Sequence, residues 1–254
     1  MAIKTWMAEH CLKLNDDKTE LLVITTPALA QHRHISIDIC GAMISSSCSA
    51  RNLGVVFDSS MSMKDAVAST CRRAYYQIHL IRQVRDFITE DAARTLVQAN
   101  VTSILDYCNC LLAGLPKETI DRLQRVQNAA ARVVKKAHGR EHVTPILQEL
   151  HWLPVAYRIK YKVNMLTFKS LRGLAPTYLQ ELFVPYTPTR LLRSQGQGLL
   201  TIPRFKRQTV GGRAFATQGA SLWNELPPDL RNEQSLNLFK SKLKTFYFKI
   251  AFNL

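Results

Sequence analysis

Two basic amphipathic segments, joined by a turn that contains histidines and prolines, constrain this chain more than any other feature. In the first segment, apolar residues recur at three- and four-residue spacings, which places them on one stripe of a helix: Leu123, Val126, Ala130, Val133, Val134 and Ala137. Four cations lie between them and are expected to point largely away from the stripe: Arg125, Arg132, Lys135 and Lys136. We expect a helix over 117–137 that Gly139 terminates.

A second helix is expected over 155–171, because Pro154 is tolerated at the start of a helix but not inside one. Its apolar residues alternate with four cations: Arg158, Lys160, Lys162 and Lys169. The sequence therefore predicts two helices with apolar seams and cationic outer faces. Such faces are either ordinary solvated surface or a surface that follows the phosphates of a nucleic acid.

The distribution of charge favours the nucleic-acid alternative. The chain of 254 residues has a formal charge of +15, and residues 61–254 contain 29 Lys and Arg against 13 Asp and Glu. Between Glu181 and Glu225 there is no acidic residue, whereas that interval contains six cations: Arg190, Arg193, Arg204, Lys206, Arg207 and Arg213. A one-sided excess implies a polyanionic partner. Nucleic acid is the commonest one, because each cation placed on a phosphate releases a condensed counterion.

Composition and the N-terminal sequence predict an intracellular protein, nuclear or cytoplasmic, without a membrane partner. Hydrophobic residues make up 46% of the chain, as in globular proteins. There is no run of about 20 apolar residues, and the N-terminus lacks the apolar centre of a signal peptide. The six cysteines have irregular spacing, so we expect reduced thiols rather than a disulfide framework.

The pattern along the chain predicts an α+β fold that is mainly α-helical. A helix over 1–12 precedes alternating apolar residues at 20–25, 35–39 and 53–57, which predict a small N-terminal antiparallel sheet, with Ser45–Ser49 interpreted as a turn. Helices are expected over 62–87, from an N-cap at Thr89 to about Leu105, and over 236–252. Glycines, Gly219 among them, and prolines interrupt 173–228, so no long helix is expected there. The predicted parts are 1–60, 61–140 and a basic, partly irregular region over 141–254.

Two sets of residues raise the question of further sites. Zinc could be considered for Cys108, Cys110, His138, His142 and His151, but a Cys-x-Cys pair is tighter than the usual zinc spacing and the histidines are distant, so no metal site is expected. Trp152 and Trp223 could stack on bases; packing of both rings onto helices is the preferred alternative.

Seven segments share features with one known family of polymerases. They are Trp6 with LKLNDDKTELLVI (12–24), RNLGVVFDSSMSM (51–63), ILDYCNCLLAGLP (104–116), LQRVQNAAARVV (123–134), HVTPILQELHWLPV (142–155), APTYLQEL (175–182) and SLWNELPPDLR (221–231). With them the chain resembles, over nearly its whole length, the C-terminal part of the reverse transcriptases of non-LTR (LINE-type) retrotransposons of the Jockey-like group. Each segment is weak alone, but the set is specific.

The resemblance implies that 1–60 is the end of the polymerase palm, 61–140 a helical thumb and the remainder the family's basic C-terminal region. Lys18 matches the lysine that the family places near the leaving pyrophosphate. The family's catalytic Asp pair, which holds two Mg²⁺ ions, belongs to a Tyr/Phe-x-Asp-Asp turn that would precede residue 1. The resemblance therefore implies no cofactor and no catalytic residue in this chain, and no polymerase activity from it alone. Asp16 and Asp17 are interpreted as an ordinary turn.

The expected function is that of a truncated RNA-directed DNA polymerase that retains its template- and primer-binding parts. The expected partners are RNA and RNA–DNA hybrid, bound without base readout through Arg125, Arg132, Lys135, Lys136, Arg158, Lys162, Arg204, Lys206, Arg207 and Arg213. On this hypothesis Arg132→Ala or Lys135→Ala makes the salt dependence of binding shallower by about one. The alternative is a retrotransposon-derived structural or protein-interaction remnant.

Overall fold

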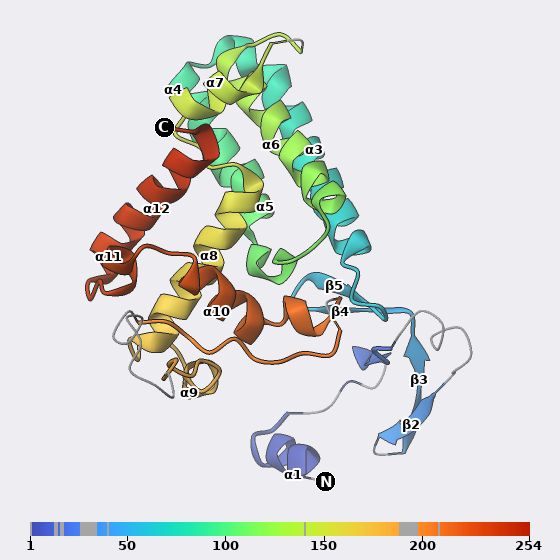
Figure 1. Cartoon of the computed structure of the whole chain (residues 1–254). Helices are drawn as coiled ribbons and strands as arrows, with labels where there is room; N and C mark the ends of the chain where they lie inside the picture. The colour runs from blue at the N-terminus through green and yellow to red at the C-terminus, as the bar shows by residue number, and fades with distance from the viewer. Residues whose placement is uncertain are drawn as a thin grey trace. The chain divides into compact units, whose positions relative to one another are not determined.

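The structure is a computed structural model that describes residues 2–12, 15, 18–25, 35–39, 41–139, 141–187, 198–207 and 209–254. The chain forms two compact units, Met1–Ala66 and Val67–Leu254 (Figure 1). The described residues are mainly helical, with a few short strands in the first unit, which confirms the coarse α+β class. In the described part, no helix has the length and apolar character needed to cross a bilayer.

The described residues of the first unit form the helix α1, several short strands and the start of α3 (Lys64–Val84). The helix and the strands are α1 (Ala2–Glu9), β1 (Leu21–Leu22), β2 (Ser36–Ile39), β3 (Ala42–Ser47), β4 (Ser49–Asn52) and β5 (Val55–Asp58). β2 and β3 are antiparallel, with Ile37 opposite Ile44, and β4 and β5 form a separate antiparallel pair. β1 pairs with β3 in parallel, giving the strand order β1-β3-β2. The prediction of a purely antiparallel sheet is therefore wrong at β1.

The Ser-rich stretch was predicted to be a turn, but it forms the end of β3 and the start of β4. Its hydroxyl groups find partners within the sheet. The Ser45 and Ser36 hydroxyls lie 3.1 Å apart, and the Ser47 hydroxyl donates to the Leu21 carbonyl at 3.3 Å. These hydroxyl groups therefore link β3 to both of its neighbours, β2 and β1.

Asp58, at the end of β5, organises the turn that leads into the next helix. Its carboxylate accepts hydrogen bonds from the amide and hydroxyl of Ser60 (3.1 and 2.6 Å), the amide and hydroxyl of Ser62 (2.8 and 3.2 Å) and the amide of Met63 (2.8 Å). Met61 and Met63 have positive φ values of 55° and 59°. Partial burial raises the pKa of the Asp58 carboxyl, but these hydrogen bonds outweigh it and hold the pKa below its ordinary value of 3.8.

The second unit is built from helices. They are α3 (Lys64–Val84, which begins at the end of the first unit), η2 (Arg85–Phe87), α4 (Glu90–Val97), the π-helical η3 (Gln98–Thr102), α5 (Ser103–Asp106), η4 (Asn109–Leu112), α6 (Lys117–Lys135), α7 (Val143–Glu149), α8 (Val155–Leu171), α9 (Thr177–Gln180), η5 (Gly211–Arg213), α10 (Phe215–Asn224), α11 (Pro228–Arg231) and α12 (Leu236–Phe252).

The predicted long helices are confirmed, with corrections at their ends. α8 and α12 have the expected bounds, and the Thr89 hydroxyl accepts from the Ala92 amide at 3.2 Å as the predicted N-cap. The helix that follows Thr89 continues to Asp106 but passes through the π-helical turn η3. α6 ends at Lys135 because Lys136 adopts the left-handed conformation (φ 52°), so Gly139 is not its terminator.

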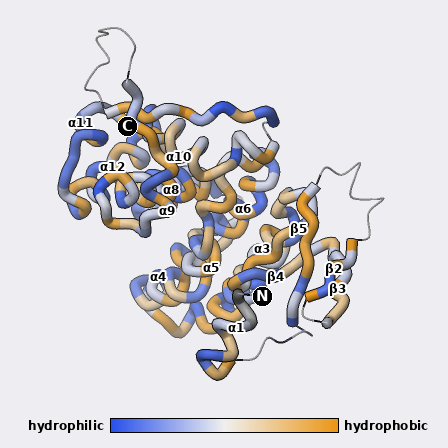
Figure 2. Tube along the Cα trace, turned by 90° about the horizontal axis from the view of Figure 1, so that it is seen from below, coloured by the Kyte–Doolittle hydropathy of each residue, from blue (hydrophilic) through white to orange (hydrophobic). Residues whose placement is uncertain are grey.

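The second unit has two apolar cores that share α8. The N-terminal half of α8 contributes Val155, Ile159 and Val163 to a core with α3, α4, α6 and α7. Its C-terminal half contributes Met165 and Phe168 to a core with α10 and α12, where the Phe168 and Phe239 rings stack with centroids 4.3 Å apart. Figure 2 shows hydrophobic and hydrophilic residues alternating along these helices, as expected for amphipathic helices. The first of these two cores therefore contains helices from both sides of residue 140.

α10 forms where interruptions by glycine predicted no long helix. Gly219 lies inside it and is buried. A Cβ atom at this position would lie 2.7 Å from the Phe183 ring and 2.8 Å from the Thr167 hydroxyl of α8. Glycine is required here because α10 and α8 approach each other closely, so the expectation that Gly219 breaks a helix is wrong.

Candidate nucleic-acid interface

The four predicted cations of α6 have different environments. Arg125 and Lys136 are exposed, whereas Arg132 and Lys135 are half-buried, so the expectation that all four point away from the apolar stripe is only partly confirmed. The Arg132 guanidinium donates from Nη2 to the Glu141 carbonyl at 3.1 Å. Its Nε is buried without a hydrogen-bond partner in the described structure.

Lys135 links three helices through two carboxylates. Its ammonium pairs with Glu90 at the start of α4 (2.5 Å) and with Glu149 at the end of α7. Hydrogen bonds to Glu149 and Glu90 raise the pKa of Lys135 above its ordinary value of 10.5, so the side chain stays charged at neutral pH. This charge is already compensated within the fold.

Lys136 also has an internal partner, although it remains exposed. Its ammonium lies 2.7 Å from the Asp86 carboxylate, which follows α3. The hydrogen bond from Lys136 holds the pKa of Asp86 below its ordinary value. Exposed pairs of this kind contribute little to stability, so a phosphate can compete for Lys136 more readily than for Lys135.

The two predicted cations of α8 differ in the same way. Arg158 forms a two-point ion pair with Asp106 at the end of α5, with its Nε 2.9 Å from Oδ1 and its Nη2 on Oδ2. Lys162, one turn further along α8, is exposed and makes no ion pair with any described residue.

Of the four predicted cations of the acid-free segment that the structure describes, three are exposed. Arg204, Lys206 and Arg207 lie in an irregular stretch with exposed side chains. Arg213, in η5, is half-buried, and its Cγ lies so close to Gly114 that a Cβ atom there would be 2.9 Å away. Arg190 and Arg193, which also belong to this segment, lie outside the described residues.

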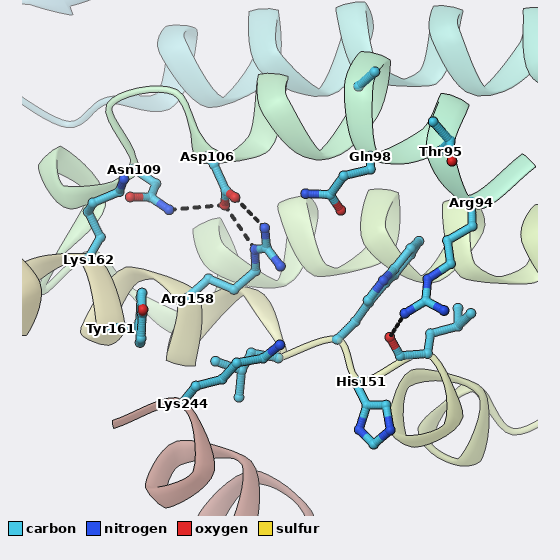
Figure 3. A pocket seen from close by; sticks show the side chains of 14 residues that line it. Arg94, Thr95, Gln98, Asp106, Asn109, His151, Arg158, Tyr161, Lys162 and Lys244 are labelled. Carbon is cyan, nitrogen blue, oxygen red and sulfur yellow. Dashed lines mark hydrogen bonds and ion pairs between the residues drawn. The ribbon is translucent and has the colours of Figure 1, made fainter. Parts of the chain in front are cut away.

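A cavity of about 680 Å³ lies within the second unit and contains Arg158 and Lys162 (Figure 3). Its walls come from α4 and η3, the end of α5, η4, the loop between α7 and α8, the first half of α8, and α12. Two further cations line it: Arg94 of α4, which donates to the Leu150 carbonyl at 3.2 Å, and Lys244 of α12. Asp106 is its acidic lining residue. The cavity is therefore strongly cationic.

The polar lining of the cavity includes one side chain with an unmatched atom. Asn109 is 2% exposed, and its amide nitrogen donates to Asp106 Oδ1 at 3.2 Å. Its Oδ1 is buried and accepts no hydrogen bond in the described structure. Because a carboxylate only accepts, the NH₂ of Asn109 must face Asp106, and Oδ1 is forced to point elsewhere. Burial also raises the pKa of the Tyr161 hydroxyl, which stays protonated at neutral pH.

The tryptophans serve packing, as the preferred alternative predicted for both. Trp223 is 2% exposed within the second core and donates from Nε1 to the Gly198 carbonyl at 2.9 Å, so its ring is not available for stacking on bases. Trp152 is 7% exposed and belongs to the first core, although it also lines the cavity.

The remaining sequence candidates show no assembled site in the described part. Lys18 is exposed in the first unit, and its amide donates to Asn15. Asp16 and Asp17 lie outside the described residues. No group of three His, Cys, Asp or Glu among the described residues is placed to bind a metal ion. Burial raises the pKa of the Cys110 thiol, which disfavours its thiolate.

Sequence reasoning missed the cavity, because its residues come from distant parts of the chain. Arg94 and Lys244 lie about 150 residues apart in the sequence and line the same cavity. Each was part of an ordinary helical pattern, and no local spacing connects them. Comparisons with protein-family models, with curated proteins and with solved structures found no match to this chain.

Proposed function

We propose that this chain is the C-terminal part of a non-LTR retrotransposon reverse transcriptase and binds RNA and RNA–DNA hybrid through the phosphates. In this proposal the first unit corresponds to the end of the palm, α3 to α6 to the thumb, and the helices from α7 onward to the family's basic C-terminal region. Its role is to hold template and primer rather than to catalyse phosphoryl transfer.

The observation that carries the proposal is the imbalance of charge in the second unit. This unit contains 28 Lys and Arg against 12 Asp and Glu. In its described part, six of those acids pair with five cations, which removes half of the acids from any competition for the remaining cations. The cations that stay exposed and outside these pairs include Arg125, Lys162, Arg204, Lys206 and Arg207.

The test is a salt titration of affinity for an RNA–DNA hybrid, with heparin as a competing polyanion. Each phosphate neutralised by a cation contributes about 0.9 to the slope of log affinity against log salt. We expect a slope that reports several phosphates and a hybrid that heparin displaces poorly. If the chain binds heparin and the hybrid with equal affinity, or does not bind the hybrid, the proposal is contradicted.

A pair of α6 variants sharpens this test. Arg125→Ala removes an exposed cation, and we expect the slope to become shallower by about one for every nucleic-acid sequence tried. Lys135→Ala is the matched control on the same helix. Because Lys135 already pairs with two glutamates, we expect a smaller change than the sequence alone predicted. Equal slopes for wild type and Arg125→Ala would place Arg125 outside the interface.

A protein-interaction remnant is the second candidate, and one feature of α3 and of η2, which follows it, favours this candidate. Four apolar side chains at helical spacing are exposed, by 60%, 38%, 43% and 88% respectively: Tyr76, Leu80, Val84 and Phe87. Apolar stripes of this kind mark surfaces for other proteins. This candidate predicts that hybrid and heparin bind alike and that Arg125→Ala changes neither.

A further inference from the structure

We propose that the cavity between α4, α8 and α12 binds a nucleoside phosphate. The first argument is its charge. Arg158 and Asp106 neutralise each other, which leaves Arg94, Lys162 and Lys244 without a carboxylate partner among the described residues. Three uncompensated cations around one cavity favour an anionic ligand, and phosphate is an anion that Arg and Lys bind through charge-assisted hydrogen bonds.

The second argument is the shape and lining of the cavity. Its volume of about 680 Å³ lies in the usual range for small-ligand sites. Trp152, Leu153 and Tyr161 provide aromatic and apolar wall, against which a planar base can pack. Figure 3 shows Lys162 directed toward Asn109 and Lys244 reaching from α12 into the same space, so cations border the apolar wall.

Two sources can supply this ligand: a free mononucleotide or the phosphorylated end of a nucleic-acid strand. Both offer the same chemistry to the cavity. The inference does not rest on the proposed hybrid binding, because mononucleotide affinity and the salt slope for hybrid are separate measurements, and either can fail while the other holds.

The experiment is a calorimetric titration of the full chain with adenosine 5′-monophosphate (AMP), adenosine, ribose 5-phosphate and inorganic phosphate. We expect AMP to bind at least about tenfold more tightly than the other three, since each of them lacks one of the recognised groups. No binding of AMP would overturn the proposal. Equal affinity for AMP and ribose 5-phosphate would overturn it as well, because ribose 5-phosphate lacks the base and the base would then contribute nothing to binding.

Charge-matched double variants locate the binding. Lys162→Gln with Lys244→Gln removes two cavity cations, and we expect AMP affinity to fall about tenfold or more. Lys169→Gln with Lys249→Gln removes two cations from the same helices, α8 and α12, outside the cavity, and is expected to leave AMP affinity within about twofold. Equal losses in both variants would overturn the assignment. If the first pair fails to fold, as judged by circular dichroism, Lys244→Gln alone replaces it.

A last comparison separates the two sources. A short single strand with a 5′-phosphate is compared with the same strand bearing a 5′-hydroxyl. A tighter grip on the phosphorylated strand that disappears in the Lys162 and Lys244 double variant identifies a strand end as the ligand. AMP binding without any such preference identifies the free nucleotide. Either result supports the shared chemistry, whereas a preference that survives in the double variant contradicts it.

Discussion

At the scale of single residues, Asp58 shows how one carboxylate can order a turn. Five donors from Ser60, Ser62 and Met63 converge on it, and the backbone around them includes two methionines with positive φ. Met63, the residue directly before α3, is also buried, at 1% exposed. The chain's entry into α3 therefore combines a charged hydrogen-bond acceptor with packing of one apolar side chain.

We predict that Asp58→Ala destabilises the first unit by about 2 kcal/mol, because hydrogen bonds to a charged acceptor are lost together. The pKa of Asp58 is lowered in the fold, so its contribution is present above its ordinary pKa of 3.8 and is lost as pH falls through the lower folded value. Hydrogen exchange at the Ser60, Ser62 and Met63 amides measures this locally. If wild type and variant differed in stability by the same amount at pH 7 and at pH 2, the prediction would be contradicted.

A second prediction at this scale concerns Gly219. We expect Gly219→Ala to destabilise the second unit by roughly 1–2 kcal/mol, because the new methyl group would meet the Phe183 ring and the Thr167 hydroxyl in a packed interior. Gly139→Ala is the control, since a Cβ atom there meets nothing within 4 Å. Urea unfolding of both variants checks this, and equal midpoints would show that α8 and α10 can separate without cost.

At the scale of the helices, Arg85 of η2 binds the C-terminal end of α6. Arg85 is 8% exposed, and its guanidinium donates from Nε to the Val133 carbonyl at 2.9 Å, from Nη2 to the Val134 carbonyl at 2.7 Å and from Nη1 to the Ile88 carbonyl at 2.9 Å. The first two belong to the last turn of α6, where carbonyls have few partners within the helix; the Val133 carbonyl also accepts from the Lys136 amide at 3.4 Å. A cation suits this position because the negative end of the helix dipole lies there.

We predict that Arg85→Met destabilises the second unit by about 3 kcal/mol, since it removes three charge-assisted hydrogen bonds to carbonyls. Arg85→Lys is expected to recover only part of this, because an ammonium cannot reproduce the forked geometry. Arg82→Met, an exposed neighbour on α3, serves as the control. Thermal unfolding followed by circular dichroism gives the ranking, and similar melting temperatures for the Arg85 and Arg82 variants would refute it.

The sequence predicted the elements best where helices are long and amphipathic. α8 and α12 were predicted with their observed bounds, because Pro154 marks the start of α8 and apolar spacing marks the length of both helices. The Ser-rich strands were missed, since β3 and β4 carry hydroxyls where alternating apolar residues would identify a strand. The helix around Gly219 was missed because propensity disfavours glycine, whereas close packing requires it here.

The candidate site was predicted only in part for a related reason. Exposure of Arg125 and Lys162 follows from helix periodicity, which is local. The pairing of Lys135 with Glu90 and of Arg158 with Asp106 joins residues 45 and 52 positions apart, and the cavity joins more distant ones still. Such pairings depend on how the helices pack, which spacing along one helix does not encode.

At the scale of the whole molecule, the arrangement of the two cores bears on cooperativity. Both cores lie within Val67–Leu254, and α8 contributes to each of them. If α8 leaves one core, the other core also loses its α8 residues and becomes exposed to solvent. We therefore expect the second unit to unfold in a single transition despite having two cores.

A fragment tests this directly. We predict that residues 59–254, which retain all of α3, unfold in one cooperative thermal transition close in temperature to the main transition of the full chain. Calorimetry of both proteins makes the comparison. A fragment without a cooperative transition, or with two resolved ones, would show that the second unit depends on the first or that its cores are independent.

The contact between Arg85 and the last turn of α6 also affects how binding experiments are interpreted. Its acceptors are carbonyl groups, which do not titrate, and it is buried where added ions screen poorly. Raising the salt concentration therefore weakens the attraction between exposed lysines and a ligand while the junction under them keeps its geometry. A loss of nucleic-acid binding at high ionic strength consequently reports on the ligand's departure and not on collapse of the helices that present those lysines.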